Sequence, residues 1–402
     1  MRKMTKNFTF PLLIAILFSL ISSNIYAAMQ KETTTDTSNL ITMEQCQIAG
    51  EKWLLCNYND GTEIRDIIPI KSLDETLNAY CINYVKNSQP NGYLVLNADI
   101  NSTSFIREFA LDGNGIYEQL LENCAITTRS VENVIYSTNP FEYAIKFKEA
   151  GVEKFYNSNS IVMLSSEQKK HYLSENIYVT SNEASTNNAA RNKTEYSNSF
   201  FSGSVLTSYQ YDDDYLIMSA TNYTPYIMSA VRNGTNSENC GPTAVLNIVG
   251  IKRNGGWHSI ILNESITDTY ADIVTKTGFN KNGTSGITYA KAKSGLKAYV
   301  ESRNFNITIN DYWFDRFSDF KEDFDDDKMN LMYIRGYSYD SGSNSWEDVG
   351  HFIVGIGYRI MEDGSRYIRV CDGWNATNNR FLNFDSNALT VLQGTSVEIS
   401  KY

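Results

Sequence analysis

Cysteine and histidine are both scarce in this sequence, which has six cysteines and three histidines among 402 residues. Six cysteines are too few for a disulfide-built scaffold, and no CxxC pair or cysteine–histidine cluster has the spacing of zinc ligands. We therefore expect no metal site and no cofactor. His171 lies among charged residues and His258 follows a helix end, so His351 is the histidine that we weigh for chemistry.

Positive charge is also in deficit, because 46 acidic residues outnumber 35 lysines and arginines and give a formal net charge of -11. A surface of that sign repels the phosphates of nucleic acids and of anionic lipids. Neither nucleic acid nor a membrane is therefore expected as a partner. The content of 42% hydrophobic residues is enough for a large core, and the length predicts two or three domains.

Residues 1–27 have the pattern of a cleaved secretion signal. A basic start, Met1–Lys6, precedes an apolar run, Phe10–Ile21, and small residues follow near Ala27. The run is too short to span a membrane, and the C-terminus carries no hydrophobic tail. We expect a secreted, extracellular protein that has no membrane contact once the signal is removed.

Residues 28–182 are predicted to form a smaller α+β domain. Apolar periodicity predicts helices over residues 73–85 and 141–155, and buried strands over residues 93–98 and 160–164.

Cys46 and Cys56 lie ten residues apart around Gly50, in a protein that is expected to be exported. A disulfide across a hairpin is one interpretation of this spacing, and two free thiols are the other. The sequence leaves both interpretations open.

Residues 183–204 have the composition of a linker, because they are rich in Ser, Asn and Thr and have almost no aliphatic residues. Linkers are where proteases cut, and Arg191 and Lys193 lie within this one. It is either an activation site between a pro-segment and a catalytic domain or a plain tether. The sequence does not choose between these interpretations.

Residues 205–402 are predicted to form a second domain that is helical first and then rich in strands. The periodicity predicts helices over residues 240–254, 269–276 and 287–301, followed by strands over residues 305–309, 330–337, 351–358 and 367–370.

Cys240 is expected at the N-terminus of the first of these helices. Pro242 suits a first helical turn, and Gly255 can end the helix. Unpaired amides at a helix start can lower a thiol pKa from about 8.5 to roughly 3.5–7.5, which favours a nucleophilic thiolate. The alternative for a single cysteine is a small core residue that begins a helix.

His351 is predicted to open a buried strand, and Asp372 follows the next strand along the chain. Two antiparallel strands joined by a hairpin bring the start of one beside the end of the other. Asp372 is therefore expected to reach the His351 ring and to fix its tautomer. The alternative for Asp372 is a turn residue before Gly373.

The order Cys240, His351 and Asp372, in the motifs NCGPTA, GHFIVGIGY and CDGW, resembles the papain-like cysteine peptidases. The similarity is to the branch of bacteriocin-leader-processing peptidases and covers about residues 209–384. Residues 73–113, with GYLVLNAD, are similar to the pro-segments of streptopain-type peptidases. The resemblance implies an α+β fold in which a two-lobed catalytic domain, one lobe helical and the other antiparallel β, follows a smaller N-terminal domain.

One position departs from the family pattern. The family places a Gln about six residues before the nucleophile, where it helps to bind the oxyanion. That position is Gly234 here. The sequence leaves open whether Asn233, Asn236 or Asn239 supplies the donor instead, beside the backbone amide of Cys240.

The resemblance implies peptide-bond hydrolysis through a Cys240 thioester, with His351 as general base and acid and Asp372 as the orienting group. Asn375 is the alternative orienting residue. Protein or peptide substrates are the expected partners, and the N-terminal domain is an expected intramolecular inhibitor of a zymogen. A thioester-dependent transferase and a non-catalytic secreted binding module are the two alternative functions.

Overall fold

The computed structural model describes residues 39–123 (without 74, 101 and 103), 131–139, 142–149, 152–157, 161–162, 200–201, 206–261, 265–312, 316–340, 345–385 and 391–401. The chain divides into two compact units, Met1–Leu40 and Ile41–Tyr402, and the second unit holds every element described below. The expected signal peptide, His171 and most of the expected linker lie outside the described residues, so those predictions stay predictions.

The N-terminal half (residues 39–162) begins with a helix and continues mainly as strands. Its elements are α2 (Met43–Asn57), β1 (Glu63–Lys71), β2 (Leu77–Lys86), β3 (Gln89–Asn97), β4 (Ile106–Ala110), α3 (Ile116–Asn123), β5 (Val131–Asn139), β6 (Glu142–Glu149), β7 (Val152–Asn157) and β8 (Ile161–Val162).

The C-terminal half (residues 200–401) places most of its helices before most of its strands. Its elements are β9 (Tyr211–Leu216), η2 (Met218–Ala220), α6 (Met228–Val231), α7 (Cys240–Asn254), η3 (His258–Ile260), α8 (Ile266–Thr277), α9 (Tyr289–Ser302), β10 (Phe305–Asp311), α10 (Phe317–Asp325), β11 (Met329–Asp340), β12 (Ser345–Met361), β13 (Arg366–Cys371), β14 (Arg380–Asn383) and β15 (Val391–Lys401).

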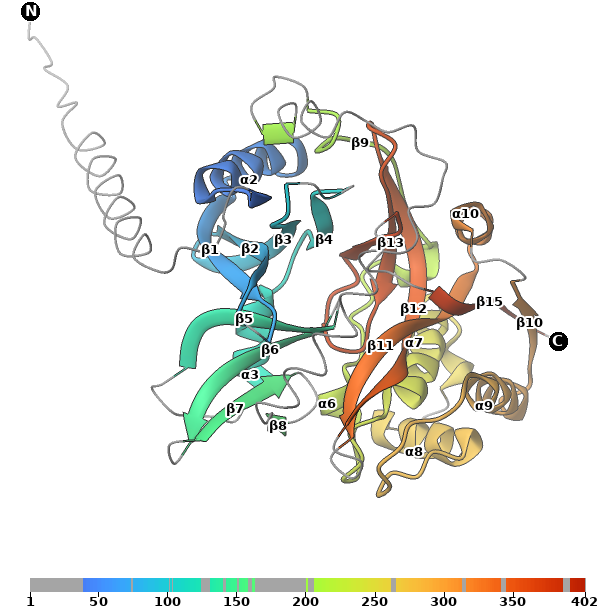
Figure 1. Ribbon diagram of the computed structural model, residues 1–402. Coiled ribbons are helices and arrows are strands. Elements are labelled where there is room, and N and C mark those ends of the chain that lie inside the picture. The colour runs from blue at the N-terminus through green and yellow to red at the C-terminus, as the bar shows by residue number, and fades with distance from the viewer. Residues whose placement is uncertain are drawn as a thin grey trace, which may run out of the picture. The chain divides into compact units, whose positions relative to one another are not determined.

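A single sheet runs through both halves. Its strands follow the order β10-β15-β11-β12-β13-β14-β4-β3-β2-β1-β5-β6-β7-β8, and β9 pairs with β12 beside this path. The halves join where β14 pairs antiparallel with β4, which sets Phe381 opposite Phe109. In Figure 1, β4 lies on the side of the N-terminal half that faces β13, the other neighbour of β14. The fold is therefore α+β, as expected, with one sheet on both sides of the expected linker.

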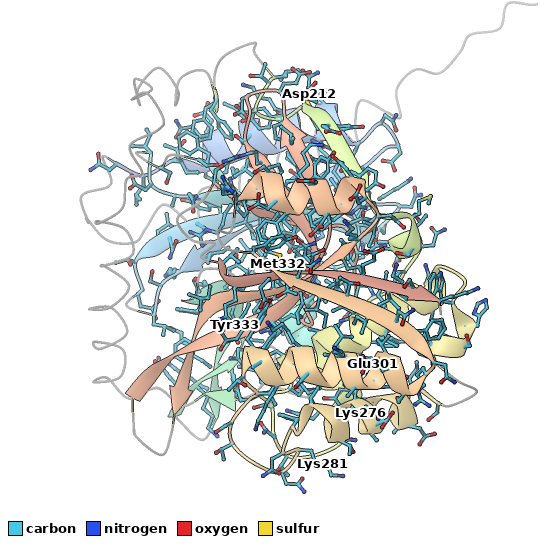
Figure 2. The ribbon with its side chains drawn as sticks, turned by 90° about the vertical axis from the view of Figure 1, so that its right-hand side faces the viewer. Asp212, Lys276, Lys281, Glu301, Met332 and Tyr333 are labelled. Carbon is cyan, nitrogen blue, oxygen red and sulfur yellow. The ribbon has the colours of Figure 1, made fainter. Side chains whose placement is uncertain are left out.

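The helices predicted in the C-terminal half are confirmed at α7, α8 and α9, and the predicted strands at β10 to β13. Helix α7 is buried along nearly its whole length, because it contacts β12 as well as α8 and α9. Figure 2 shows Met332 among the side chains of the sheet, whereas Lys281 and Glu301 lie at the outer, helical side. Met332 is fully buried and both charged residues are exposed.

The helix predicted over residues 73–85 is wrong, because strand β2 occupies most of this stretch. Strand β2 pairs with β1 on one side and with β3 on the other, and six of its consecutive residues are buried. A strand that is buried on both faces has a nearly continuous apolar sequence, and such a run cannot be distinguished from a buried helix by periodicity alone. The strand predicted over residues 93–98 is confirmed by β3.

The helix predicted over residues 141–155 is also wrong. Strands β6 and β7 form an antiparallel ladder there, in which Lys146 lies opposite Phe155. Tyr143, Ile145 and Phe147 alternate at the period of a strand, and all three are buried. The strand predicted over residues 160–164 corresponds to the short β8.

The disulfide considered between Cys46 and Cys56 is excluded, because both thiols are free. Both residues lie on α2 and not in a hairpin. Ten residues along a helix span about 15 Å, which is far more than a disulfide can bridge.

No helix among the described residues is long and apolar enough to cross a membrane.

Candidate active site

Cys240 is the first residue of α7, as the sequence predicts. Asn239 precedes it at the N-cap position, and its side chain donates to the carbonyl of Met228 (3.0 Å) and to the hydroxyl of Tyr270 (2.9 Å). A Cβ added at Gly241 would lie 2.6 Å from Ile287 and 3.4 Å from the Phe352 ring. The helix start is therefore held tightly against Phe352 of β12, the residue that follows His351 in the chain.

The thiol of Cys240 lies among backbone amides but is almost fully buried, with 7% of the residue exposed. Burial is the main effect and raises the thiol pKa to about 12, and the Glu238 carboxylate adds to the rise. The amides of Phe352, Gly241 and Cys240 oppose this shift without cancelling it. The expectation that the helix start lowers the Cys240 pKa is wrong for this buried site. Removal of the thiol from water raises the pKa by more than the backbone amides lower it.

His351 lies inside β12 and not at its start, because the strand begins at Ser345 and sets His351 opposite Ile334 on β11. The predicted antiparallel neighbour is present, since β13 pairs with β12 and places Cys371 opposite Val354. The chain turns into the following loop at Gly373, whose φ of 78° favours glycine. This register brings the residue after β13, Asp372, to the His351 ring.

The contact between His351 and Asp372 differs from the expected one. Nε2 of His351 lies 2.7 Å from the main-chain carbonyl oxygen of Asp372. The carboxylate of Asp372 accepts hydrogen bonds from other groups. A carbonyl oxygen can only accept, so Nε2 must carry the proton and Nδ1 is the basic nitrogen of the neutral ring. Asp372 thus fixes the tautomer as predicted, but with its backbone.

Trp374 covers the His351 ring. The two ring centroids are 3.8 Å apart and the planes differ by 6°, which is a parallel stack. With only 7% of His351 exposed, burial is the main cause that lowers its pKa to about 4, and the Arg380 charge acts in the same direction. Burial therefore favours the neutral form of both the Cys240 thiol and the His351 imidazole.

The Asp372 carboxylate holds its own loop in place. It accepts hydrogen bonds from the amides of Trp374 (2.7 Å) and Asn375 (2.8 Å) and from the Asn375 side chain (2.6 Å). It also pairs with Arg380. Burial is the largest single influence and opposes ionisation of Asp372, but the Arg380 guanidinium and the hydrogen bonds from Asn375 together hold the pKa of the carboxyl below its usual value.

Asn375, the alternative orienting residue, donates its side-chain amide to Asp372 and not to His351. In this structure Asn375 holds the Asp372 carboxylate in place, and that carboxylate holds the loop from Asp372 to Asn375.

Arg380 and Glu108 complete this cluster, and neither was predicted from the sequence. Arg380 opens β14 and pairs through Nη1 with Asp372 and through Nη2 with Glu108 on β4 (2.7 Å). At most 2% of any of the three residues is exposed. The hydroxyl of Tyr93 donates to the second oxygen of Glu108 (3.1 Å). No local motif marks such a set, because 272 residues separate Glu108 from Arg380.

Two of the three asparagines considered as oxyanion donors use their amide groups elsewhere. The Asn239 amide bonds Met228 and Tyr270, and the Asn236 amide bonds the carbonyls of Asn280 and Ser285. Asn233 is exposed in the loop before α7.

Gly234 occupies the position where the family has Gln. A Cβ there would lie 2.1 Å from the carbonyl oxygen of Lys281, so this backbone leaves no room for a glutamine.

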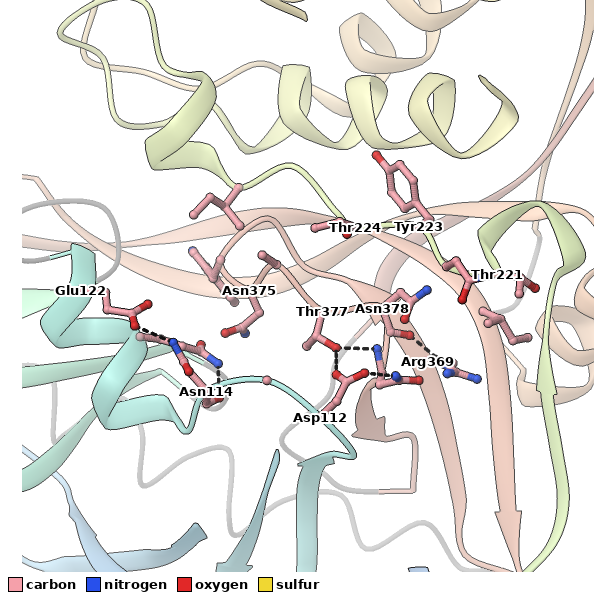
Figure 3. Close-up of a pocket in the computed structure, with 18 residues that line it drawn as sticks. Asp112, Asn114, Glu122, Thr221, Tyr223, Thr224, Arg369, Asn375, Thr377 and Asn378 are labelled. Atoms are coloured by element: carbon pink, nitrogen blue, oxygen red, sulfur yellow. Dashed lines mark hydrogen bonds between the residues drawn. The ribbon is translucent and has the colours of Figure 1, made fainter. Parts of the chain in front are cut away.

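A cavity of about 680 Å³ lies beside the Asp372 loop and is lined from both halves. Figure 3 shows Asn114 and Glu122 on one side and Thr377 and Asn378 on the other. Asp112 bridges the halves here, because it accepts hydrogen bonds from Thr377 and Asn379.

Comparisons with known proteins add little to this geometry. No protein-family model matches the chain, and no curated protein matches it. Among solved structures, the chain is similar to a candidate C39-like peptidase from Bacillus anthracis, with 13% identity and a TM-score of 0.29. The match covers 46% of this chain and 98% of that one. A likeness of this size carries no argument, so function is argued from the site alone.

Proposed function

We propose that the chain is a secreted thiol peptidase with a two-lobed, papain-like catalytic domain, in which Cys240 is the nucleophile and His351 the general base and acid. The observation that carries the proposal is the meeting of α7 and β12. The amide of Phe352 on β12 is directed at the Cys240 sulfur, and His351, the residue before Phe352, has its ring held by the Asp372 carbonyl and the Trp374 stack.

In the proposed reaction, Nδ1 of His351 takes the thiol proton while the Cys240 sulfur attacks the carbonyl carbon of a peptide bond. The tetrahedral intermediate collapses to a thioester, and the leaving amine takes the proton from the imidazolium. A water molecule, deprotonated by His351, then attacks the thioester and releases the carboxylic acid and the thiol. The backbone amide of Cys240 is available to the developing oxyanion.

The burial of both reacting groups supports the zymogen expectation. A thiol with a pKa of about 12 and an imidazole with a pKa of about 4 do not exchange a proton readily. Access of water would bring the two pKa values towards each other and favour the thiolate–imidazolium pair. We propose that the N-terminal half restrains the site until the linker is cut.

The test is hydrolysis of an unfolded protein substrate, before and after limited cleavage in residues 183–204. Wild type is compared with Cys240→Ala, His351→Ala and Cys56→Ala, the last of which removes a free thiol on α2 that lies outside the site. We expect cleavage to raise the activity, Cys56→Ala to retain it, and the two site variants to lose it by several orders of magnitude, at least about 10³-fold.

Activity of Cys240→Ala within about tenfold of wild type would contradict the assignment, because loss of a nucleophile costs far more. Product formation that requires an added amine acceptor would favour a transferase. A cut chain that neither hydrolyses nor transfers would favour a binding module.

A further inference from the structure

The buried cluster of Asp372, Arg380 and Glu108 reaches from the candidate site into the N-terminal half. We infer that Glu108 is a positioning residue for His351, acting through Arg380 and Asp372, and that the N-terminal half therefore stays bound as part of the active enzyme after the linker is cut. This inference rests on the proposed function and extends it to the other half of the chain.

The His351 ring depends on the loop after β13 for its hydrogen-bond acceptor. Because that acceptor is a main-chain carbonyl, no side chain at position 372 can supply or remove it. Its place depends on the path of the loop from Asp372 to Asn375. Three bonds from within the loop hold the carboxylate, and Arg380 ties the carboxylate to the sheet.

Arg380 links the Asp372 loop to the N-terminal half. Its guanidinium also lies 5.9 Å from the Trp374 ring, so it contacts both residues that hold His351. A buried guanidinium needs hydrogen-bonded opposite charge to offset its loss of water, and its rigid planar donors match the geometry of carboxylates. Asp372 supplies one carboxylate and Glu108 supplies the other. Without Glu108, the guanidinium loses one of its two carboxylate partners.

Glu108 is held at the site because its strand, β4, is firmly attached to the C-terminal half. Strand β4 pairs with β14 along the register that sets Leu382 opposite Glu108. Phe109 stacks on Phe381 with centroids 4.6 Å apart and packs edge-on against Tyr367 at 5.1 Å. Removal of the N-terminal half would expose these aromatic rings, the edge of β14 and the buried charge of Arg380. Breaking a buried ion pair by removing one partner is strongly unfavourable, so the halves are expected to stay together.

Together, these contacts describe an enzyme of two chains after activation. The half that is expected to restrain the closed site also supplies a residue that positions His351. Cleavage of the linker, without loss of the N-terminal half, is then the activating event.

The experiment uses the full chain cut within the linker, with Glu108→Gln as the test variant. This change removes the charge, yet its amide oxygen still accepts from Arg380. The matched control is Asn57→Ala, because Asn57 on α2 accepts from the buried Arg359 (3.0 Å) across the same junction without contact to the Asp372 loop. Wild type and Cys240→Ala are run in parallel, and all variants are compared by thermal unfolding and by gel filtration.

We expect both halves of the cut wild type to elute together. We expect Glu108→Gln to lower kcat by about tenfold or more while KM changes by less than about twofold, because the base is misplaced and substrate contacts are not. Asn57→Ala is expected to lower the melting temperature similarly and to keep kcat within about twofold.

The pH profile supplies a readout that a purely structural role would not move. The charged groups that face His351 are Asp372 and Arg380, and Glu238 faces the thiol. Glu108→Gln leaves the Arg380 charge less compensated, which disfavours the imidazolium and shifts the acidic limb of kcat/KM to lower pH. If this variant fails to fold, Glu108→Asp serves in its place, because it keeps the carboxylate on a side chain that is shorter by one methylene. Glu108→Asp is expected to lower kcat without shifting the acidic limb of the kcat/KM profile.

Each remaining result overturns a stated claim. Separation of the halves on gel filtration with activity retained would contradict the two-chain enzyme. Equal kcat values for the Glu108 variants and Asn57→Ala would contradict the positioning role, while Cys240-dependent activity of wild type would still support the proposed function. Loss of any difference between wild type and Cys240→Ala would overturn both.

Discussion

Nε2 of His351 donates to the main-chain carbonyl of Asp372, while the carboxylate of the same residue holds the loop and binds Arg380. One residue therefore acts on the ring through its backbone and on the surrounding structure through its side chain. The two roles can be separated by mutation, because a side-chain substitution leaves the carbonyl in place.

Asp372→Asn is expected to lower kcat by about tenfold, as Glu108→Gln does, because an NH2 group replaces one oxygen that accepts hydrogen bonds from Arg380 or the loop, while the carbonyl still fixes the tautomer of His351. Asp372→Ala removes every bond to the loop and is expected to lower kcat by about 10- to 100-fold. Steady-state kinetics of the cut enzyme measures both. A loss near 10⁴-fold for Asp372→Asn is what a direct carboxylate–imidazole bond would give, and it would contradict the backbone contact.

Trp374 is predicted to act as a cover for the bond between His351 and Asp372. Trp374→Phe keeps an aromatic ring over the imidazole and is expected to change kcat by less than about threefold, whereas Trp374→Ala admits water and is expected to lower kcat by about tenfold or more. Because burial is the main cause of the low His351 pKa, the Ala variant should also raise that pKa towards 6.5. NMR titration of the imidazole in the intact chain measures the shift, and an unchanged pKa would contradict the role of Trp374 as a cover.

Acid stability follows from the same burial. The pKa of His351 falls from 6.5 to about 4 on folding, so between these values the unfolded chain binds the additional proton. The free energy of unfolding should therefore lose nothing to His351 above pH 6.5. It should fall by about 3 kcal/mol through this residue as the pH drops to 4. Urea unfolding of wild type and His351→Asn at both pH values isolates this contribution. Equal losses in the two proteins would show that His351 does not carry it.

The sequence predicted those parts of the fold in which local signals and tertiary contacts agree. Cys240 begins α7 because Pro242 and the apolar spacing both favour a helix there, and the strand that carries His351 and the strand that ends just before Asp372 have β-rich, apolar composition. The two misassigned helices lie in the N-terminal half, where pairing with the strands just before and after each segment decides the structure. Tyr80 to Tyr84 become strand residues because β1 and β3 lie on either side of them.

The reacting side chains of the candidate site could be predicted from the sequence. Their pKa values, hydrogen bonds and ion pairs could not. The sequence places Cys240 at a helix start, yet the burial that raises its pKa depends on the packing of the folded chain. It also marks Asp372 as a carboxylate near His351, although only the folded loop shows that the carbonyl makes the contact. Glu108 carries no local signal, because its partner lies across a strand pairing between the two halves.

The central claim is that Cys240 and His351 form a nucleophile and base that are latent in the intact chain. The most direct measurement is the rate of Cys240 alkylation by iodoacetamide between pH 5 and 9, followed by peptide mass spectrometry, before and after linker cleavage. In the intact chain the thiol pKa of about 12 predicts slow alkylation that rises with pH and reaches no plateau. In the cut chain we expect fast alkylation with a plateau near neutral pH, and His351→Ala should abolish that plateau, because a thiolate paired with imidazolium is then lost. Identical pH profiles for the cut wild type and the cut His351→Ala variant would contradict the account.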